Sequence, residues 1–196
     1  PTRVGSLPPV LAAMNMTNIN TQLLTIEAAR TRKKEDILLE AKALAQSGVR
    51  ELIIIAQDTT RYGDDLYGKP CLDELLYELN KIEGIEWIRL LYCYPDRITD
   101  SLLKAMADCE KVLHYIDLPL QHASGRILKA MNRHGDDKSL LELIEKIRSY
   151  MPDCILRTTF ITGFPGETEE DFEILSQFVK DARFDRLGCF SYSPED

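Results

Sequence analysis

The sequence predicts an α/β fold built on a parallel sheet. Short, almost wholly apolar segments such as residues 51–56 recur along the chain, as in strands that are buried on both faces of a parallel sheet. Segments with apolar residues at helical spacing separate them. Short turns join the two kinds of segment, which is the pattern of consecutive βαβ units.

The first 29 residues differ in composition from the rest of the chain. No charged residue occurs between Arg3 and Glu27, and residues 15–25 are rich in asparagine and threonine, which favour turns and caps. We therefore expect a short first strand at residues 10–13, followed by a long loop.

From residue 33 onward, helices and strands are expected to alternate. The expected helices cover residues 33–47, 72–81, 99–106, 124–131, 136–150 and 169–179. The expected strands cover residues 51–56, 87–92, 112–118, 155–161 and 186–192. Residues that favour the N-cap position precede four of the helices, namely Thr99, Ser124, Asp136 or Asp137, and Thr168.

Two architectures contain such units: an open doubly wound sheet and a TIM-like barrel, here partial. Polar residues stand at or near the C-terminal ends of the strands: Gln57 and Asp58, Tyr94 and Asp96, Gln121 and His122, Thr162 and Gly163, Ser191 and Ser193. Barrel active sites are assembled from the ends of many strands, whereas a doubly wound sheet uses fewer strands at a switch point. This distribution favours the partial barrel. No linker rich in Pro, Gly or Ser interrupts the chain, which predicts one domain over residues 1–196.

Composition narrows the class of protein. Hydrophobic residues at 44% and charged residues at 29% are ordinary for a soluble globular domain. No apolar run reaches the length of a membrane span and no signal peptide opens the chain, so we expect a cytoplasmic protein without membrane contact.

The net charge of −8 and the lack of a basic patch argue against direct nucleic-acid binding and agree with a basic protein partner. The five cysteines are scattered, as expected for a reducing compartment. The chain starts at Pro1 and stops at Asp196 in mid-pattern, so we expect the native protein to be longer.

The segment 161–168, Ile-Thr-Gly-Phe-Pro-Gly-Glu-Thr, is the most informative turn. Gly163 and Gly166 permit unusual backbone dihedrals and the close approach of a ligand. Thr168 begins a helix whose N-terminus offers N–H groups and the positive end of a dipole. We expect a site for a small polar or anionic ligand here, with a purely structural turn as the alternative. Glu167 can bind that ligand or only complement the helix N-terminus.

Other polar positions carry weaker signals. Gln57 and Asp58 can accept hydrogen bonds from an amine or from sugar hydroxyls, or only cap the turn that follows them. Arg157 is a charge inside an apolar strand, where it needs a partner, either a ligand carboxylate or an acidic side chain inside the barrel. His122 follows Gln121 in a loop and can act in acid–base chemistry, but a histidine without a carboxylate partner is more often structural. The residues alone predict a partial α/β barrel that binds a polar small molecule.

Several of these segments together resemble the radical SAM core of the methylthiotransferases. They are residues 55–63 (IAQDTTRYG), 91–95 (LYCYP), 115–122 (YIDLPLQH), 163–168 (GFPGET) and 190–195 (FSYSPE). The resemblance covers residues 30–196 and is to the RimO type, which methylthiolates the β-carbon of an aspartate in a small-subunit ribosomal protein. Relatives of the MiaB type, which modify tRNA, share the GFPGET segment but usually have a serine where this chain has His122.

The resemblance implies a partial (β/α)6 barrel of the radical SAM type that holds S-adenosylmethionine across the strand C-termini. The residues expected to bind this cofactor are Gln57, Asp58, Gln121, Ser124, Arg157, Gly163, Gly166 and Glu167. The loop at residues 163–167 is expected to line the adenosine end. Arg157, and Gln121 with Ser124, are candidates for the methionine carboxylate and the ribose, and Gln57 with Asp58 for the amino end or the substrate. The resemblance also implies a 4Fe-4S cluster and an electron-donor protein, cleavage of the cofactor to a radical, and insertion of sulfur from a second cluster.

One departure from the family pattern concerns the first cluster. The family holds it with Cys-x3-Cys-x2-Cys in the loop after the first strand, and thiolates are the required ligands. The Arg-Thr-Arg segment at residues 30–32 resembles the tripeptide that follows this motif. Counting back from it places the three positions near Ala13, Thr17 and Asn20, none of which is cysteine. Two explanations stay open: the domain lacks radical chemistry, or residues 1–29 do not represent the native segment. The family's N-terminal domain with the second cluster and its small C-terminal domain are also absent from residues 1–196.

The sequence therefore supports hypotheses of different classes. The first is the catalytic core of an aspartate methylthiotransferase. The second is a non-catalytic module without a cluster, which keeps the S-adenosylmethionine pocket or a docking surface. A tRNA methylthiotransferase of the MiaB type is the third.

Overall fold

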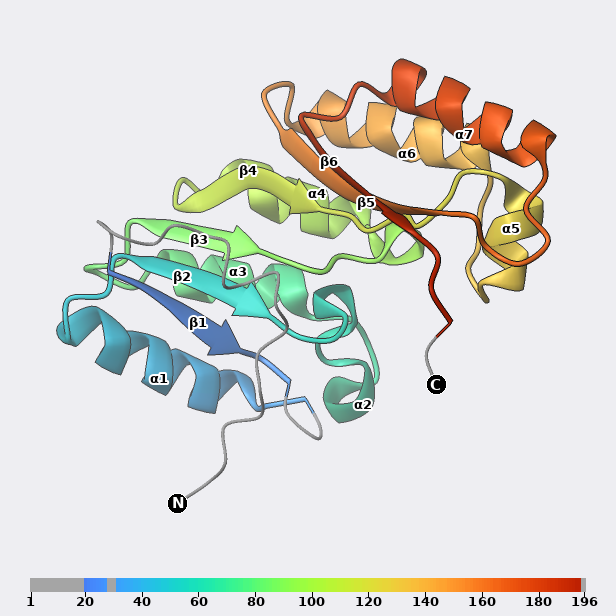
Figure 1. Cartoon of the computed structure of the whole chain (residues 1–196). Coiled ribbons are helices and arrows are strands. Elements are labelled where there is room, and N and C mark those ends of the chain that lie inside the picture. The colour runs from blue at the N-terminus through green and yellow to red at the C-terminus, as the bar shows by residue number, and fades with distance from the viewer. Residues whose placement is uncertain (1–19, 28–30, 195–196) are drawn as a thin grey trace.

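Six parallel strands form the centre of the structure, a computed structural model that describes residues 20–27 and 31–194 (Figure 1). The strands are β1 (Thr21–Thr25), β2 (Glu51–Ile55), β3 (Trp87–Leu90), β4 (Val112–Asp117), β5 (Ile155–Thr162) and β6 (Arg186–Ser191). Each strand pairs in parallel with the next, so the order in the sheet is that of the chain. A doubly wound sheet would reverse this order at its switch point. Within the described residues β1 and β6 are the two edges, so the prediction of a partial (β/α)6 barrel is confirmed.

Helices connect the strands. They are α1 (Lys34–Gln46), α2 (Asp64–Tyr67), α3 (Leu72–Asn80), α4 (Asp100–Asp108), α5 (Gly125–Ala130), α6 (Asp137–Tyr150) and α7 (Glu169–Ala182). Thr99 and Asp136 accept backbone hydrogen bonds as the N-caps of α4 and α6, as predicted. Thr168 and Asp171 form a complete capping box at the start of α7. The described helices include none long and apolar enough to cross a bilayer.

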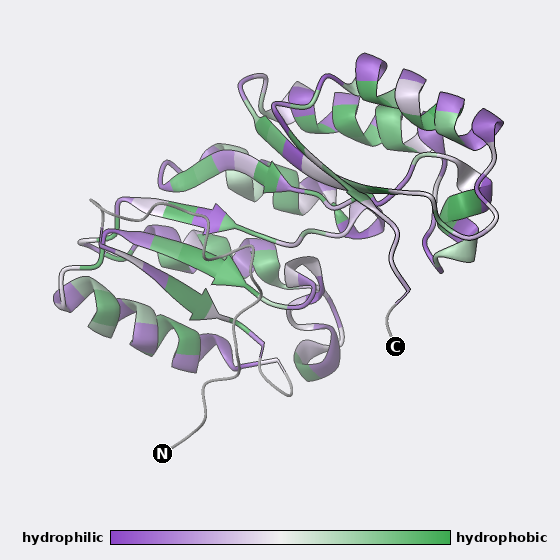
Figure 2. Ribbon diagram, in the orientation of Figure 1, coloured by the Kyte–Doolittle hydropathy of each residue, from purple (hydrophilic) through white to green (hydrophobic). Residues whose placement is uncertain are grey.

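The helices pack against one face of the sheet, where most of the core lies. Leu52 and Ile54 of β2 belong to the same buried cluster as Ile37 of α1 and Leu75 of α3. Figure 2 shows the hydrophobic residues of the strands and of the helix faces turned toward them. On the other face of the sheet a smaller cluster contains Ile53 of β2, Tyr115 of β4 and Leu91, which directly follows β3, but no residue from a helix. The alternation of side chains along each strand thus separates a helix-covered face from a helix-free inner face.

The first strand differs from the expectation. Residues 21–25, expected to lie in a long loop, form β1 and pair with β2. Leu24 of this strand is fully buried in the core that the helices cover. The strand expected at residues 10–13 lies outside the described residues. Asn20 directly precedes β1, so the ligand position that was counted back to Asn20 lies before the first strand rather than after it.

Two local details also differ from the expectation. The short helix α2 was not predicted, because four residues carry too little periodicity to identify a helix. Ser124 stands at the N-cap position of α5, but its side chain does not cap that helix. Its hydroxyl donates instead to Asp171 of α7 (2.6 Å), a residue 47 positions away in the chain.

Candidate functional site

The loop between β5 and α7 has the backbone conformation that its glycines predict. Gly163 has a φ of +75° and Gly166 a φ of +86°, in the left-handed region that favours glycine. A Cβ atom on Gly163 would meet no heavy atom within 4 Å, so this position faces open space. The loop therefore presents bare backbone at the C-terminal end of β5, where a ligand can approach closely.

Glu167 holds this loop from within. The Phe164 N–H donates to Glu167 Oε2 (3.0 Å), and the Glu167 N–H donates to the Phe164 carbonyl (2.8 Å). Two of the N–H groups expected to be free for a ligand are therefore used inside the loop. The Glu167 side chain is only 7% exposed, so in this structure it supports the loop rather than projecting toward solvent.

His122 lies fully buried beneath the loop. Its Nδ1 accepts a hydrogen bond from the Ser124 N–H (3.0 Å), so the proton of the neutral imidazole sits on Nε2. That Nε2 is 3.6 Å from Glu167 Oε1, too far for a hydrogen bond, and it has no other partner among the described residues. Burial lowers the pKa of His122, while the charge of Glu167 opposes that shift. The carboxylate beside His122, which the sequence did not identify, is that of Glu167, although the two do not form a hydrogen bond.

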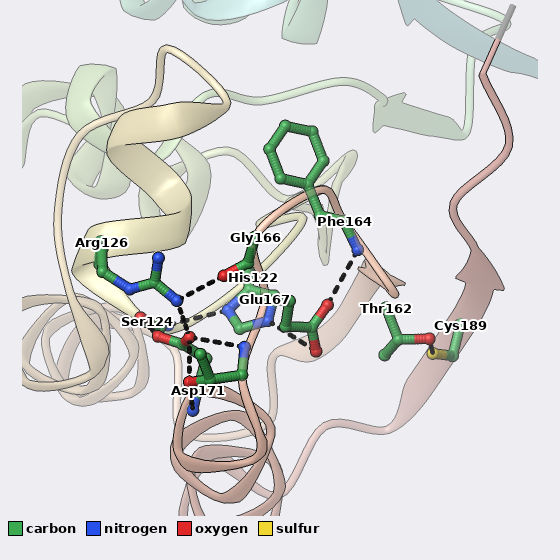
Figure 3. Close-up of polar contacts among 10 residues, drawn as sticks. His122, Ser124, Arg126, Thr162, Phe164, Gly166, Glu167, Asp171 and Cys189 are labelled. Carbon is green, nitrogen blue, oxygen red and sulfur yellow. Dashed lines mark hydrogen bonds and ion pairs between the residues drawn. The ribbon is translucent and has the colours of Figure 1, made fainter.

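Asp171 connects the loop to the segment after β4 (Figure 3). Its carboxylate accepts from the hydroxyl of Ser124 (2.6 Å), from the N–H and hydroxyl of Thr168 (2.9 and 2.7 Å) and from the guanidinium of Arg126. Arg126 also donates to the Gly166 carbonyl (2.7 Å). The hydrogen bond from Ser124 is the main reason why the pKa of Asp171 is held far below its usual range.

Gln57 and Asp58 lie at a separate part of the rim. Both line a polar cleft of about 630 Å³ beside Tyr94, Asp96 and His134. The Asp58 carboxylate accepts from the Thr60 N–H (3.0 Å) and hydroxyl, so it caps the turn that follows, as one of the two alternatives predicted. Burial raises the pKa of Asp58 and the bonds from Thr60 oppose that rise. Gln57 is exposed and can contact a ligand in the cleft.

Gln121 lies in the loop that follows β4 and forms an isolated parallel bridge with Phe160 of β5. Its φ of +70° is unusual for a residue with a side chain. The Gln121 N–H donates to the Thr159 carbonyl and its carbonyl accepts from the Ile161 N–H, both at 2.8 Å. These two bonds hold the strained conformation, which is typical of residues at functional sites.

Arg157 has its partner inside the barrel. Its guanidinium donates to Asp117 Oδ1 (2.7 Å) on the neighbouring strand β4, and the Arg157 side chain stays 27% exposed on the helix-free face. The second oxygen of Asp117 accepts from the Tyr92 N–H (3.2 Å). An acidic side chain thus serves as the partner of Arg157, one of the two alternatives predicted, while the role of Arg157 toward a ligand stays a prediction.

The cysteines do not fit an iron–sulfur cluster. The connection from β1 to α1, residues 26–33, contains no cysteine, and no three of the five cysteines have the required spacing. Four of the five are buried, and burial raises the pKa of both Cys93 and Cys154 to about 12, which disfavours the thiolate. Within the described residues, no group of three or more His, Cys, Asp or Glu side chains is placed to hold a metal ion.

The residues do fit the organic cofactor that the resemblance implies. Gly163 offers bare backbone that faces open space, and the cleft beside Gln57 and Asp58 offers acceptors for an ammonium group or for hydroxyls. The structure divides the predicted site residues into two groups, however. Ser124, Gly166 and Glu167 belong to the polar network beneath the loop, whereas Gln57 and Asp58 lie in the cleft. The sequence missed Arg126 and Asp171 as members of this network because nothing local links residues 45 positions apart.

Comparison with known proteins agrees with these features. Residues 19–179 match the Radical SAM superfamily. The chain is 56% identical over 166 residues to the ribosomal protein uS12 methylthiotransferase RimO of Alkaliphilus oremlandii, and 56% identical over 167 residues to that of Clostridioides difficile. Each match covers 85% of this chain and 38% of the relative, so the chain spans well under half the length of these relatives.

Solved structures with little sequence similarity share the fold. The radical S-adenosylmethionine methyltransferase TsrM of Kitasatospora setae superposes with a TM-score of 0.67 at 13% identity, over 87% of this chain and 35% of that one. Coproporphyrinogen III oxidase HemN of Escherichia coli, a radical SAM enzyme, gives a TM-score of 0.62 at 17% identity, over 89% and 44% of the two chains. The chain therefore belongs to the radical SAM superfamily and, within it, to the methylthiotransferases of the RimO type.

Proposed function

We propose that this chain is the central part of an enzyme that methylthiolates an aspartate of ribosomal protein uS12. The observation that carries the proposal is the 56% identity to uS12 methylthiotransferases over 85% of the chain. The predicted rim segments lie within the described fold at the C-terminal ends of consecutive strands. Because the chain spans 38% of these relatives, the complete reaction belongs to the longer protein.

In this proposal the rim binds S-adenosylmethionine, which supplies the radical source when it is bound. The bare backbone at Gly163 and Gly166 receives the adenosine end, with Glu167 keeping the loop in shape from below. Gln57 and Asp58 receive the amino end of the cofactor or the substrate in the polar cleft. Gln121, held in its left-handed conformation by its hydrogen bonds to β5, is the proposed contact for the ribose, and the buried Ser124 supports the loop through Asp171.

Arg157 completes the proposed set of cofactor contacts. Its guanidinium has several N–H donors, and one of them is engaged by Asp117. A half-buried guanidinium on the inner face can therefore hold the methionine carboxylate while it stays paired with Asp117. The ion pair fixes the direction of the side chain before the ligand arrives, which lowers the entropic cost of binding.

No reaction step is assigned to an iron–sulfur cluster, because the residues of this chain do not fit one. The family needs an electron from such a cluster to cleave the cofactor, and the connection after the first strand, residues 26–33, contains no cysteine to hold one. This absence favours a second candidate function, a non-catalytic module that binds S-adenosylmethionine without cleaving it. The iron content of residues 1–196 after anaerobic reconstitution separates the two, since stoichiometric iron would contradict the second candidate.

The substrate proposal rests on the relatives, and charge supports it. The chain carries a net charge of −8, which favours association with a basic ribosomal protein over association with tRNA. An electron-donor protein and a cytoplasmic location follow from the same proposed reaction. No residue is assigned as the general acid or base.

One experiment tests the substrate. The full-length protein, reconstituted with iron and sulfide under anaerobic conditions, is incubated with S-adenosylmethionine, a reductant and either uS12 or unmodified tRNA. We expect mass spectrometry to detect a methylthio group on an aspartate of uS12 and none on nucleosides from the tRNA. Methylthiolated tRNA with unmodified uS12 would show that the protein is of the MiaB type instead.

A further inference from the structure

Asp171 is buried to a degree that helix capping does not require. It is 4% exposed, although it stands in the first turn of a surface helix. The capping box of α6 has the two residue types in reversed order, with Asp136 at the N-cap and Ser139 at N3, and there Asp136 is exposed. Capping is thus achieved at α6 without burying the carboxylate. Burial of a charge is costly unless the charge is paired and hydrogen-bonded, so the contacts of Asp171 outside its own helix require an explanation.

Those contacts come from Ser124, which directly precedes α5, and from Arg126 in the first turn of α5. The Ser124 hydroxyl and the Arg126 guanidinium both donate to Asp171, across 47 and 45 residues of chain respectively. Arg126 then reaches the carbonyl of Gly166 (2.7 Å) with the same nitrogen, so one guanidinium touches both the helix start and the glycine loop. We call Ser124, Arg126 and Asp171 the Asp171 bridge (Figure 3).

The bridge acts on the part of the loop that is exposed. Gly163 and Gly166 are exposed, and their backbone conformations lie outside the region that other residues favour. A glycine-rich loop loses much conformational entropy when it is ordered, so a ligand that orders it binds weakly. The bridge fixes the C-terminal side of the loop at Gly166 and Thr168, and Glu167 fixes the other side at Phe164. The loop is therefore ordered before a ligand arrives.

We propose that Arg126 and Asp171 are positioning residues that hold the 163–167 loop in the conformation that receives S-adenosylmethionine. They act through the loop backbone and do not touch the cofactor themselves. This inference rests on the proposed function for the identity of the ligand. The order of the loop itself does not depend on that identity, so the two can be tested separately.

The test compares four variants with the wild-type chain. Asp171→Asn and Arg126→Ala break the bridge, and Arg126→Lys keeps a cation that can reach one of the two acceptors. Asp136→Asn removes a capping carboxylate of α6 whose side chain, among the described residues, hydrogen-bonds only with Ser139 and not with the loop or the bridge. Calorimetric titration with S-adenosylmethionine gives the affinity, at a temperature at which urea titration shows every variant to be folded. Hydrogen–deuterium exchange gives the protection of the amides of Phe164, Glu167 and Thr168.

We expect Asp171→Asn and Arg126→Ala to weaken binding by about tenfold, because hydrogen bonds to charged groups contribute on this scale. The loop amides should exchange faster in both variants, and Arg126→Lys should recover part of both losses. Asp136→Asn should lose helix-capping stability but keep wild-type affinity and loop protection. Equal affinity in wild type and Arg126→Ala, or an equal loss in Asp136→Asn, would overturn the inference.

The outcome for the wild-type chain separates the two proposals. If it binds no S-adenosylmethionine while the bridge variants still lose loop protection, the proposed function fails and the ordering role of the bridge stands. If it binds the cofactor and the bridge variants keep both affinity and protection, the proposed function stands and the positioning role is wrong.

Discussion

Replacement of Gly163 by alanine tests the proposed cradle most sharply. At this position the backbone has a φ of +75°, and a Cβ atom would meet no heavy atom within 4 Å. The substitution therefore adds one methyl group at the rim without a clash in the protein. Two effects are expected, one on the free energy of unfolding and one on ligand binding.

The first effect follows from the backbone. The left-handed conformation costs an L-residue about 1–2 kcal/mol relative to glycine. Alanine recovers about 0.5 kcal/mol of this by restricting the unfolded chain. The net loss of about 1 kcal/mol corresponds to a decrease in Tm of about 2–4 °C for a chain of this size.

The second effect follows from the ligand. If the adenosine end of S-adenosylmethionine packs against the bare backbone, the new methyl group occupies its place. Overpacking of a close contact costs about 1–3 kcal/mol, so we expect calorimetry to show binding weakened by about tenfold or more.

Gly68 provides a matched control. It has a φ of +72°, a Cβ there would also meet nothing within 4 Å, and it ends α2 away from the loop. Gly68→Ala should lose a similar Tm while its affinity for S-adenosylmethionine stays at the wild-type value. Wild-type affinity in Gly163→Ala, or an equal loss of affinity in Gly68→Ala, would refute the cradle.

Three further variants test other parts of the structure. Burial lowers the pKa of His122 in the folded state, so below about pH 6.5 the unfolded chain takes up a proton that the folded chain does not. The free energy of unfolding, measured in urea, should therefore fall from pH 7 toward pH 5, and His122→Asn should flatten that slope. An unchanged slope in His122→Asn would contradict the lowered pKa. Arg157→Met leaves the carboxylate of Asp117 buried without its ion-pair partner and should lose about 3 kcal/mol of stability. The control Arg186→Met, at the exposed position that pairs with Arg157 across the sheet, should lose little. Similar losses in the two variants would show that the ion pair between Arg157 and Asp117 is not important for stability. Phe160→Ala removes a core ring that is 1% exposed and should lower the free energy of unfolding, measured by chemical denaturation, by about 3–5 kcal/mol. A loss below 1 kcal/mol would show that the core around Phe160 is not packed as described.

Local patterns in the sequence were sufficient for most of the fold. The apolar segment at residues 51–55 and the capping box at Thr168 each determine an element within a few residues, so β2 and α7 were predictable. The first strand was missed because its threonines and Gln22 resemble a turn when the partner strand is unknown. Pairing with β2 and burial of Leu24 overrode that local preference, which is how tertiary contacts usually decide short strands.

The candidate site was less predictable than the fold. The glycines of the loop predict an unusual backbone conformation, and the positive φ angles of Gly163 and Gly166 confirm this prediction. The support beneath the loop depends on which connections the barrel places side by side. Neither the approach of Glu167 to His122 nor the contact between Arg126 and Asp171 leaves a trace in local spacing, because each joins the segment that follows β4 to the segment that follows β5.

The central claim is that S-adenosylmethionine binds at the C-terminal rim of the partial barrel. Its most direct test is a titration of the isotope-labelled chain with S-adenosylmethionine, followed through the backbone amide resonances in NMR spectra. We predict that the shifted resonances cluster at the rim, in Gln57, Asp58, Gln121, Gly163 and Gly166. The absence of any shift at saturating cofactor, or shifts confined to the N-terminal ends of the strands, would contradict the account.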